Sequence, residues 1–495
     1  MLSPNTEAFE REILIEDSGF REYDARWLYP QQLNLRGTHA LGMGIGTYLN
    51  NKGIRPDIVV GHDYRSYSAE IKYALMAGLM ATGCRVHDIG LALSPVAYFA
   101  QFALDCPAVA MVTASHNENG WTGVKMGAER PLTFGPEQIQ YLKEIIKTRA
   151  FKPGAGSYHY YPNIKDQYIA DLVKDRVISR KLKVVVACGN GTAGAYAPAA
   201  LEKLGCKVIP VDCKLDYTFP RHNPNPEDLE MLHAMRDEVI RNGADIGFAF
   251  DGDGDRCGVV DNTGEEIFAD KMGVILTRYL THVYDNKNFV VDVKSTGLYW
   301  TDPILKERGS KVEYWKTGHS YIKRRVSETN ALAGFEKSGH FFFNAPIGRG
   351  YDDGVLSAIM ICTMLDQYPA QKLSDLREDL PHTWGSPTMS PYCADDRKYE
   401  VVREISEFYE KKMERKETII GQKIKSIQTI NGIRITLQDG TWGLVRASSN
   451  KPCLVVVVES PVSEEAMQAM FSEIDNALGR FEEVGEYDQK LKLAA

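Results

Sequence analysis

The segments IVVG (58–61), SAEIKYALMAGLMATG (68–83) and VHDI (86–89) follow one another near the start of the chain. Apolar residues of the middle segment recur at helical spacing up to Gly83, IVVG is an apolar run of strand length, and VHDI has the length of a next strand. We therefore predict a strand–helix–strand unit. The same order returns in KVVVA (183–187), AYAPAALEKLG (195–205) and KVIPV (207–211), and again in FVVDV (289–293), LYWTDPILKERG (298–309) and KVEYW (311–315).

The last quarter of the chain has a different pattern. VREISEFYEKKMERK (402–416) predicts one helix, and residues 464–481 predict another. Between them, SIQTINGIRITLQDG, TWGLVRAS and CLVVVVES predict strands joined by short polar turns. We expect an α/β fold of three related α/β domains and a smaller C-terminal α+β domain. The domains that we predict span residues 1–161, 162–262, 263–380 and 381–495.

Length and composition exclude several classes of protein. A chain of 495 residues is too long for one hydrophobic core. Its 58 basic and 66 acidic residues give a net charge of -8, which disfavours binding to nucleic acid or anionic lipid. Nine scattered cysteines without a CxxC pair fit neither a zinc ribbon nor a disulfide framework. The N-terminus lacks the pattern of a secretion signal, and no apolar run approaches the ~18 residues of a membrane span. We expect a reduced, cytoplasmic protein.

The sequence DGDGDR, residues 251–256, follows the apolar run IGFAF. Asp251, Asp253 and Asp255 stand two residues apart in a glycine-rich loop, so their carboxylates can converge on one hard cation such as Mg²⁺. An EF-hand calcium loop would have Gly at its sixth and Glu at its twelfth position, where this chain has Arg256 and Asn262. A phosphatase-like nucleophilic aspartate and a solvated acidic turn remain open alternatives.

Three further loops carry polar groups at strand ends. In TASHNENG (113–120), Ser115 can present its hydroxyl for covalent chemistry, although a capped turn with a hydrogen-bonded histidine gives the same pattern. In GFEKSGH (334–340), Glu336 and Ser338 would point the same way from an extended loop and hold two sugar hydroxyls. RASSNKP (446–452) contains a cation, hydroxyls and backbone amides, which are the groups that make up an anion-binding loop. Either of the last two loops could equally be a polar turn. A nucleophile, a metal site, a polyol site and a phosphate site together predict phosphoryl transfer on a sugar.

At this point the motifs resemble those of the α-D-phosphohexomutases, the phosphomannomutase/phosphoglucomutase family, and most closely its bacterial bifunctional branch. The resemblance covers nearly the whole chain in order, through the motifs FREYDAR (20–26), TASHNENG, CGNGTAG (188–194), DGDGDR, DVKST (292–296), WKTGHSYIK (315–323), EKSGH and LVRASSNKP. It implies four domains around a central active-site cleft.

The resemblance also implies residue roles. It makes Ser115 the phosphoserine, with the metal held by Asp251, Asp253, Asp255 and a phosphoserine oxygen. Other expected catalytic residues are Arg26, His116, Lys125 and His340, the last as a proton shuttle. The expected substrate-binding residues are Tyr23, Arg256, Lys294, Gly318, His319, Glu336, Ser338, Arg446, Ser448, Ser449 and Asn450. We expect a basic cleft inside the acidic protein, formed by Arg26, Lys125, Arg256, Lys294, Lys323 and Arg446.

The function implied is an isomerase that moves a phosphoryl group between the 1- and 6-positions of mannose and glucose phosphates. It would act through a 1,6-bisphosphate, with Mg²⁺ as cofactor, on small sugar phosphates and as a monomer or weak dimer. The phosphoglucosamine branch usually has SASHNP and RPSGTEP, whereas this chain has TASHN and RASSN. Alternatives are a phosphoglucosamine mutase, an aspartate-dependent sugar-phosphate phosphatase and a non-catalytic sugar-phosphate binding protein.

Overall fold

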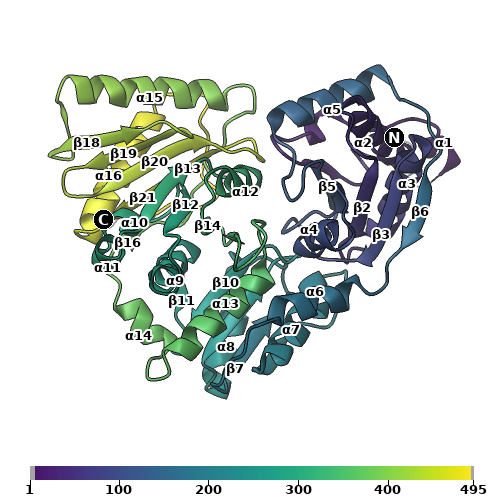
Figure 1. The fold of residues 1–495 in the computed structure, drawn as a ribbon. Helices are drawn as coiled ribbons and strands as arrows, with labels where there is room; N and C mark the ends of the chain where they lie inside the picture. Colours follow the sequence, from purple (N-terminus) through teal and green to yellow (C-terminus); the bar gives the residue numbers. More distant parts are fainter. Residues whose placement is uncertain (1–5, 492–495) are drawn as a thin grey trace.

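The computed structural model describes residues 6–491, which form four sheets. The chain passes from the N-terminal sheet (purple) through two teal and green units to the C-terminal sheet (yellow-green), and Figure 1 shows the first and last sheets on opposite sides of the molecule. One hydrophobic cluster runs from Val59 through the second and third units to Val457. The units therefore share buried contacts, which fix their loops relative to one another.

The first sheet has the strand order β1-β5-β4-β2-β3-β6. Strand β2 is parallel to β3 and β4, whereas β5 is antiparallel to both β4 and β1. The helix α3 joins β2 to β3, as predicted for the first strand–helix–strand unit. The elements are β1 (Ala25–Leu28), α2 (Leu35–Asn51), β2 (Asp57–His62), α3 (Ser68–Ala81), β3 (Arg85–Leu91), α4 (Ser94–Ala103), β4 (Ala108–Val112), β5 (Trp121–Gly127), α5 (Pro136–Thr148) and β6 (Ser157–Tyr160), preceded by α1 (Glu7–Glu10) and the 3₁₀ turn η1 (Asp17–Gly19).

The second sheet has the order β11-β10-β9-β7-β8 and contains the second predicted unit, in which β7 and β8 pair in parallel. Its last strand pairs with β10 at residues 266–267, so the sheet continues slightly past the boundary that we placed at 262. The elements are α6 (Ile164–Val173), β7 (Lys183–Ala187), η2 (Thr192–Ala195), α7 (Ala197–Leu204), β8 (Lys207–Val211), α8 (Leu229–Asn242), β9 (Ile246–Phe250), β10 (Cys257–Asp261) and β11 (Glu266–Ile267).

The third sheet has the order β13-β12-β14-β15, with β12 parallel to β13 and β14. The helix expected over residues 298–309 is interrupted, because Asp302 precedes Pro303 and adopts a non-helical conformation. The elements are α9 (Ala269–Val283), β12 (Asn288–Asp292), α10 (Leu298–Thr301), α11 (Pro303–Glu307), β13 (Lys311–Trp315), α12 (His319–Glu328), β14 (Ala333–Phe335), β15 (Phe341–Phe343), α13 (Gly354–Gln367) and α14 (Leu373–Glu378).

The fourth sheet is antiparallel throughout, in the order β16-β21-β20-β19-β18-β17, as expected for the C-terminal quarter. Both predicted helices pack on its inner strands. None of the helices in residues 6–491 is both long and apolar enough to cross a membrane. The elements are β16 (Trp384–Gly385), α15 (Lys398–Glu414), β17 (Thr418–Ile419), β18 (Gln422–Gln428), β19 (Ile433–Leu437), β20 (Trp442–Ala447), β21 (Leu454–Ser460) and α16 (Glu464–Leu478).

Candidate active site

The DGDGDR loop connects β9 to β10, and its three aspartates converge. One oxygen from each of Asp251, Asp253 and Asp255 lies within 4.8 Å of the others, and all three side chains are fully buried. Gly254 has φ +69°, which allows the turn that brings the carboxylates together. At Gly252 a Cβ would lie 2.5 Å from the carbonyl oxygen of Ser115, so only glycine lets the serine loop approach this closely.

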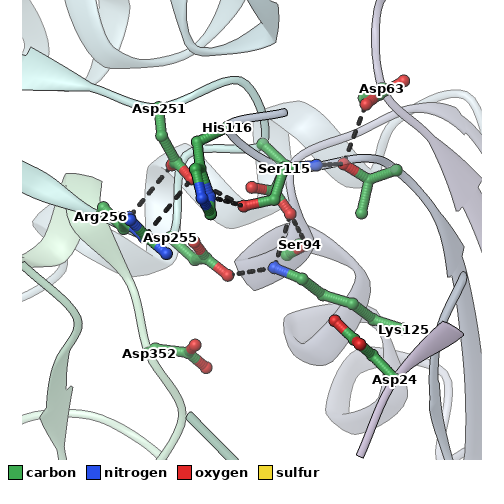
Figure 2. A network of polar contacts seen from close by, with 12 residues as sticks. Asp24, Asp63, Ser94, Ser115, His116, Lys125, Asp251, Asp255, Arg256 and Asp352 are labelled. Carbon is green, nitrogen blue, oxygen red and sulfur yellow. Dashed lines mark hydrogen bonds and ion pairs between the residues drawn. The ribbon is translucent and has the colours of Figure 1, made fainter. Parts of the chain in front are cut away.

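Ser115 lies in the loop after β4 and faces the aspartates (Figure 2). Its Oγ donates to Oδ2 of Asp251 at 3.0 Å and lies 3.3 Å from Nδ1 of His116. The residue has φ +52°, a left-handed conformation that is uncommon for a side chain other than glycine. This strained backbone directs the hydroxyl across the boundary between the first and second units.

Two residues outside the predicted site hold the serine loop in place. Arg65 donates to the carbonyl oxygens of Ser115 and Asn117 at 3.0 and 2.6 Å. Asp63 accepts from Oγ1 of Thr113 and from the backbone N–H of Ala114. Because both residues follow β2, the parallel neighbour of β4, the strand ends explain their position. Neither residue stands in one of the motifs, so the sequence alone does not point to them.

Lys125, on β5, forms ion pairs with two of the three aspartates. Its Nζ lies 2.7 Å from Oδ2 of Asp253 and also contacts Oδ2 of Asp255. Although burial opposes the charged form, these carboxylates raise the pKa of Lys125 well above its usual value. Arg256 adds a second cation, because its Nε lies 4.0 Å from Oδ2 of Asp251, so two basic side chains face the three buried carboxylates.

The aspartates retain the capacity to hold a metal ion. Within the described chain, Oδ1 of Asp253 and Oδ1 of Asp255 are buried without a hydrogen-bond partner. Burial, together with the other two carboxylates, raises the pKa of Asp251 well above its usual range. A divalent cation would satisfy the free oxygens and offset this repulsion, so the donor set fits a hard metal.

Arg26 and Tyr23 approach the serine from the FREYDAR motif. Arg26 donates to Oδ2 of Asp24 at 3.0 Å and to Oδ1 of Asn117 at 2.5 Å. The ring of Tyr23 packs edge-on against His319, with centroids 5.0 Å apart. Both predicted residues therefore lie at the active-site cavity.

His340 is held between a cation and a carboxylate. Nε of Arg256 donates to Nε2 of His340 at 3.0 Å, and Nδ1 of His340 lies 3.1 Å from Oδ2 of Asp352. Because guanidinium nitrogens only donate, this arrangement assigns the ring proton to Nδ1 and leaves Nε2 as the acceptor. Asp352 is a further residue that the sequence analysis missed.

The expectation that Lys323 lines the cleft is wrong. The side chain is fully buried, its Nζ lies 2.9 Å from Oδ1 of Asp352, and it sits 3.8 Å from the ring centre of Tyr98. Burial lowers the pKa of this lysine, and the Asp352 carboxylate partly opposes the shift. Lys323 faces the interior because the side of α12 that carries it packs against Tyr98 of α4. The spacing of apolar residues along α12 does not show which element this side meets.

The GFEKSGH segment forms a tight hairpin turn and not the extended loop that we expected. The backbone N–H of Glu336 donates to the His340 carbonyl, and Gly339 closes the turn with φ +93°. The Glu336 side chain is buried and accepts from the backbone N–H of Gly318 at 2.5 Å. Gly318 itself must be glycine, because a Cβ there would lie 2.7 Å from the ring of Tyr23.

The RASSNKP segment begins at the end of β20 and continues as a loop, which side chains from other elements hold through hydrogen bonds. Nε of Arg446 donates to Oδ1 of Asn431 at 2.8 Å, and another guanidinium nitrogen donates to Oγ of Ser449 at 3.2 Å. Lys398, near the start of α15, donates from Nζ to the Ser448 carbonyl at 2.6 Å. Asn431 and Lys398 are also residues that the sequence analysis missed.

One cavity of about 680 Å³ collects these loops from all four sheets. Asp251, Asp253 and Asp255 are fully buried and do not line the cavity, but Asp251 accepts from Ser115, which does. The predicted residues that line it are Tyr23, Arg26, Ser115, His116, Lys125, Arg256, Lys294, Gly318, His319, Glu336, Ser338, His340, Arg446, Ser448, Ser449 and Asn450.

Comparison with known proteins agrees with this arrangement. Models of the phosphoglucomutase/phosphomannomutase α/β/α domains I, II and III match residues 17–153, 166–264 and 268–384, and the model of its C-terminal domain matches residues 394–477. The chain belongs to the phosphoglucomutase/phosphomannomutase family. The resemblance inferred from the motifs and the fold class predicted from the sequence are thereby confirmed.

Relatives within this family cover most of both chains. A phosphomannomutase/phosphoglucomutase from Pseudomonas syringae pv. tomato is 36% identical over 91% of this chain and 93% of its own. A probable phosphoglucosamine mutase from Methanosarcina barkeri is 31% identical over 86% and 92%. Among solved structures, a phosphoglucomutase/phosphomannomutase family protein from Burkholderia thailandensis superposes with a TM-score of 0.84 at 31% identity, covering 94% of this chain and 98% of that one.

Proposed function

We propose that this family member is an isomerase that transfers a phosphoryl group reversibly between the 1- and 6-positions of mannose and glucose phosphates. The observation that carries the proposal is the contact of Ser115 Oγ with Asp251 at 3.0 Å, on the floor of a cavity that also contains the Arg446 loop. A nucleophile beside a metal site, in the same cavity as an anion site, suits a substrate with two phosphate positions. Relatives named phosphomannomutase/phosphoglucomutase support the choice of sugars.

The binding step uses the third and fourth units. The sugar 3- and 4-hydroxyls would bind Glu336 and Ser338, which line the cavity on one hairpin turn. This pose directs the 6-hydroxyl of a 1-phosphate toward a phosphoryl group on Ser115 Oγ. The non-reacting phosphate would bind the loop formed by Arg446, Ser448, Ser449 and Asn450.

Charge neutralisation at the serine comes from several groups. Asp251, Asp253 and Asp255, with an oxygen of phosphoserine 115, would hold Mg²⁺. The ion would neutralise charge on the transferring phosphoryl group, which otherwise lies beside three carboxylates. Lys125 keeps the carboxylates in position through its ion pairs.

A proton must leave the attacking hydroxyl, and His340 is the base that we propose. Asp352 accepts from Nδ1, which leaves the Nε2 lone pair available once Arg256 turns toward a substrate phosphate. Transfer yields a 1,6-bisphosphate. This intermediate has to reverse its orientation in the cavity before its other phosphate returns to Ser115.

The test is incubation of purified protein and Mg²⁺ with glucose 1-phosphate and a trace of glucose 1,6-bisphosphate. We expect glucose 6-phosphate, and we expect radiolabel from the bisphosphate on the peptide that contains Ser115. Free phosphate with label on an aspartate would instead identify a phosphatase, and no reaction would identify a binding protein. Parallel assays with mannose 1-phosphate and glucosamine 1-phosphate determine the sugar preference, and faster turnover of the glucosamine substrate would overturn our assignment.

A further inference from the structure

Two cysteines outside the proposed mechanism lie in contact next to the active site. Cys188 follows β7, Cys213 follows the parallel strand β8, and their Sγ atoms are 3.6 Å apart. The backbone N–H of Cys188 donates to the Val211 carbonyl at 3.2 Å, so the ladder between the two strands extends to this point. A disulfide has an S–S distance of about 2.05 Å, so the two sulfur atoms have to approach each other by roughly 1.5 Å to form the bond.

Cys213 is the least enclosed of the cysteines. All nine cysteines lie within residues 6–491, and Cys213 is the only one of them that is not buried. Its hydrogen bond with Cys188 lowers the pKa of Cys213, whereas burial raises the pKa of Cys188. A partly exposed cysteine with increased thiolate character beside a buried partner matches the attacking and resolving cysteines of redox-sensitive proteins.

The pair lies at the base of the loop 188–196, which touches the metal loop. The backbone N–H of Thr192 donates to the Gly252 carbonyl, and a Cβ on Gly191 would lie 3.3 Å from Gly252 Cα. At Gly194 a Cβ would lie 2.1 Å from the Cys213 carbonyl oxygen, so this loop packs directly on Cys213. The loop 188–196 therefore connects the cysteine pair to Gly252, which itself lies against Ser115.

We propose that Cys188 and Cys213 form a reversible disulfide when hydrogen peroxide reaches Cys213, and that this bond displaces the loop 188–196 and lowers turnover. The chemistry of the first part is independent of the proposed mutase activity. The effect of the disulfide on turnover rests on that proposed activity.

The reaction balances in two steps. The Cys213 thiolate attacks one peroxide oxygen, the O–O bond breaks, and Cys213 becomes a sulfenic acid as water leaves. The Cys188 sulfur then attacks the Cys213 sulfur, the S–O bond breaks, and the hydroxyl leaves as water with the thiol proton. Two thiols are oxidised to one disulfide, and one hydrogen peroxide is reduced to two waters.

The test is mass spectrometry of the full-length protein treated with hydrogen peroxide, alkylated and digested with trypsin. Cleavage gives one peptide for each thiol, residues 184–203 for Cys188 and residues 208–214 for Cys213. We expect these two peptides to appear linked before any other cysteine is modified, and the link to disappear with dithiothreitol. Conversion of Cys213 to a sulfinic acid without a link, or earlier oxidation of another cysteine, would overturn the proposed disulfide.

Variants separate the disulfide from its effect on turnover. Cys188→Ser should leave Cys213 as a sulfenic acid that dimedone traps. The matched control is Cys362→Ser, because Cys362 and Cys206 have sulfurs 3.9 Å apart but are both buried, and this variant should still form the link. After peroxide treatment, the turnover of the wild type should fall in proportion to the fraction of linked protein. The same treatment should leave the turnover of Cys213→Ser unchanged. A linked protein with full turnover would refute the effect on activity and leave the chemistry intact.

Discussion

Oδ1 of Asn431 lies 2.8 Å from Nε of Arg446, so a side chain in the turn between β18 and β19 orients the cation of the phosphate loop. The same oxygen accepts from the backbone N–H of Thr317 at 3.1 Å, which joins the fourth unit to the third. We expect Asn431→Ala to raise the KM for glucose 1-phosphate about tenfold with a smaller change in kcat, since a hydrogen bond to a charged group contributes about 1.5 kcal/mol. Steady-state kinetics measure this, with the exposed Thr429→Ala as the control. An unchanged KM would mean that Arg446 is oriented by other groups.

Replacement of the nucleophile should abolish turnover. Because Ser115 carries the phosphoryl group in the proposed cycle, Ser115→Ala should lower kcat by roughly a thousandfold or more. Binding of glucose 1-phosphate, measured by calorimetry, should persist, since the sugar and phosphate sites lie on other loops. The matched control is Ser472→Ala, which removes a hydroxyl that donates to the Gln468 carbonyl at 3.0 Å in α16 and does not line the cavity. Near-normal activity of Ser115→Ala would refute the covalent mechanism.

The metal requirement should depend on the three aspartates. Chelation by EDTA should stop turnover, and added Mg²⁺ should restore it. In Asp255→Asn, the half-saturating Mg²⁺ concentration should increase by about tenfold or more, because one of the charged ligands is lost. Direct Mg²⁺ titration by calorimetry checks the change independently of activity. Equal Mg²⁺ affinity in wild type and variant would show that Asp255 is not a metal ligand.

Much of the fold followed from the sequence, because strand and helix periods are local properties. The interruption at Pro303 and the tight turn at Glu336 differed from our expectations. The helical period over residues 298–309 masked the local effect of the proline on Asp302. The turn is closed by a backbone hydrogen bond between Glu336 and His340, which a residue pattern does not show. The DGDGDR loop could be recognised because all three carboxylates stand within five residues.

The supporting residues could not be found in this way. Arg65 and Asp352 reach Ser115 and His340 only through tertiary folding, from 50 and 12 residues away. Asn431 precedes Gly432 in a pattern that predicts only a hairpin turn. Lys323 was misplaced because a helical period gives the buried face of α12 but not the neighbour that this face meets. Contacts between units thus determine the part of the site that motifs do not contain.

Stability should depend on pH through Asp353, which caps α13 and does not line the active-site cavity. Burial raises the pKa of Asp353 from the usual 3.8 to about 7, opposed in part by hydrogen bonds from the Leu356 N–H and the Tyr168 hydroxyl. As pH rises between these values, the unfolded chain loses this proton before the native state does, so the free energy of unfolding falls. Asp353→Asn keeps the cap and removes the charge, and it should stabilise the protein by up to about 4 kcal/mol above pH 7, with the gain disappearing near pH 4. Urea unfolding followed by circular dichroism across this range measures the difference. Tyr168→Phe removes a donor to the carboxylate and should raise the pKa of Asp353 further, so that the fall in stability extends to higher pH. A difference between wild type and Asp353→Asn that stays constant with pH would contradict the raised pKa.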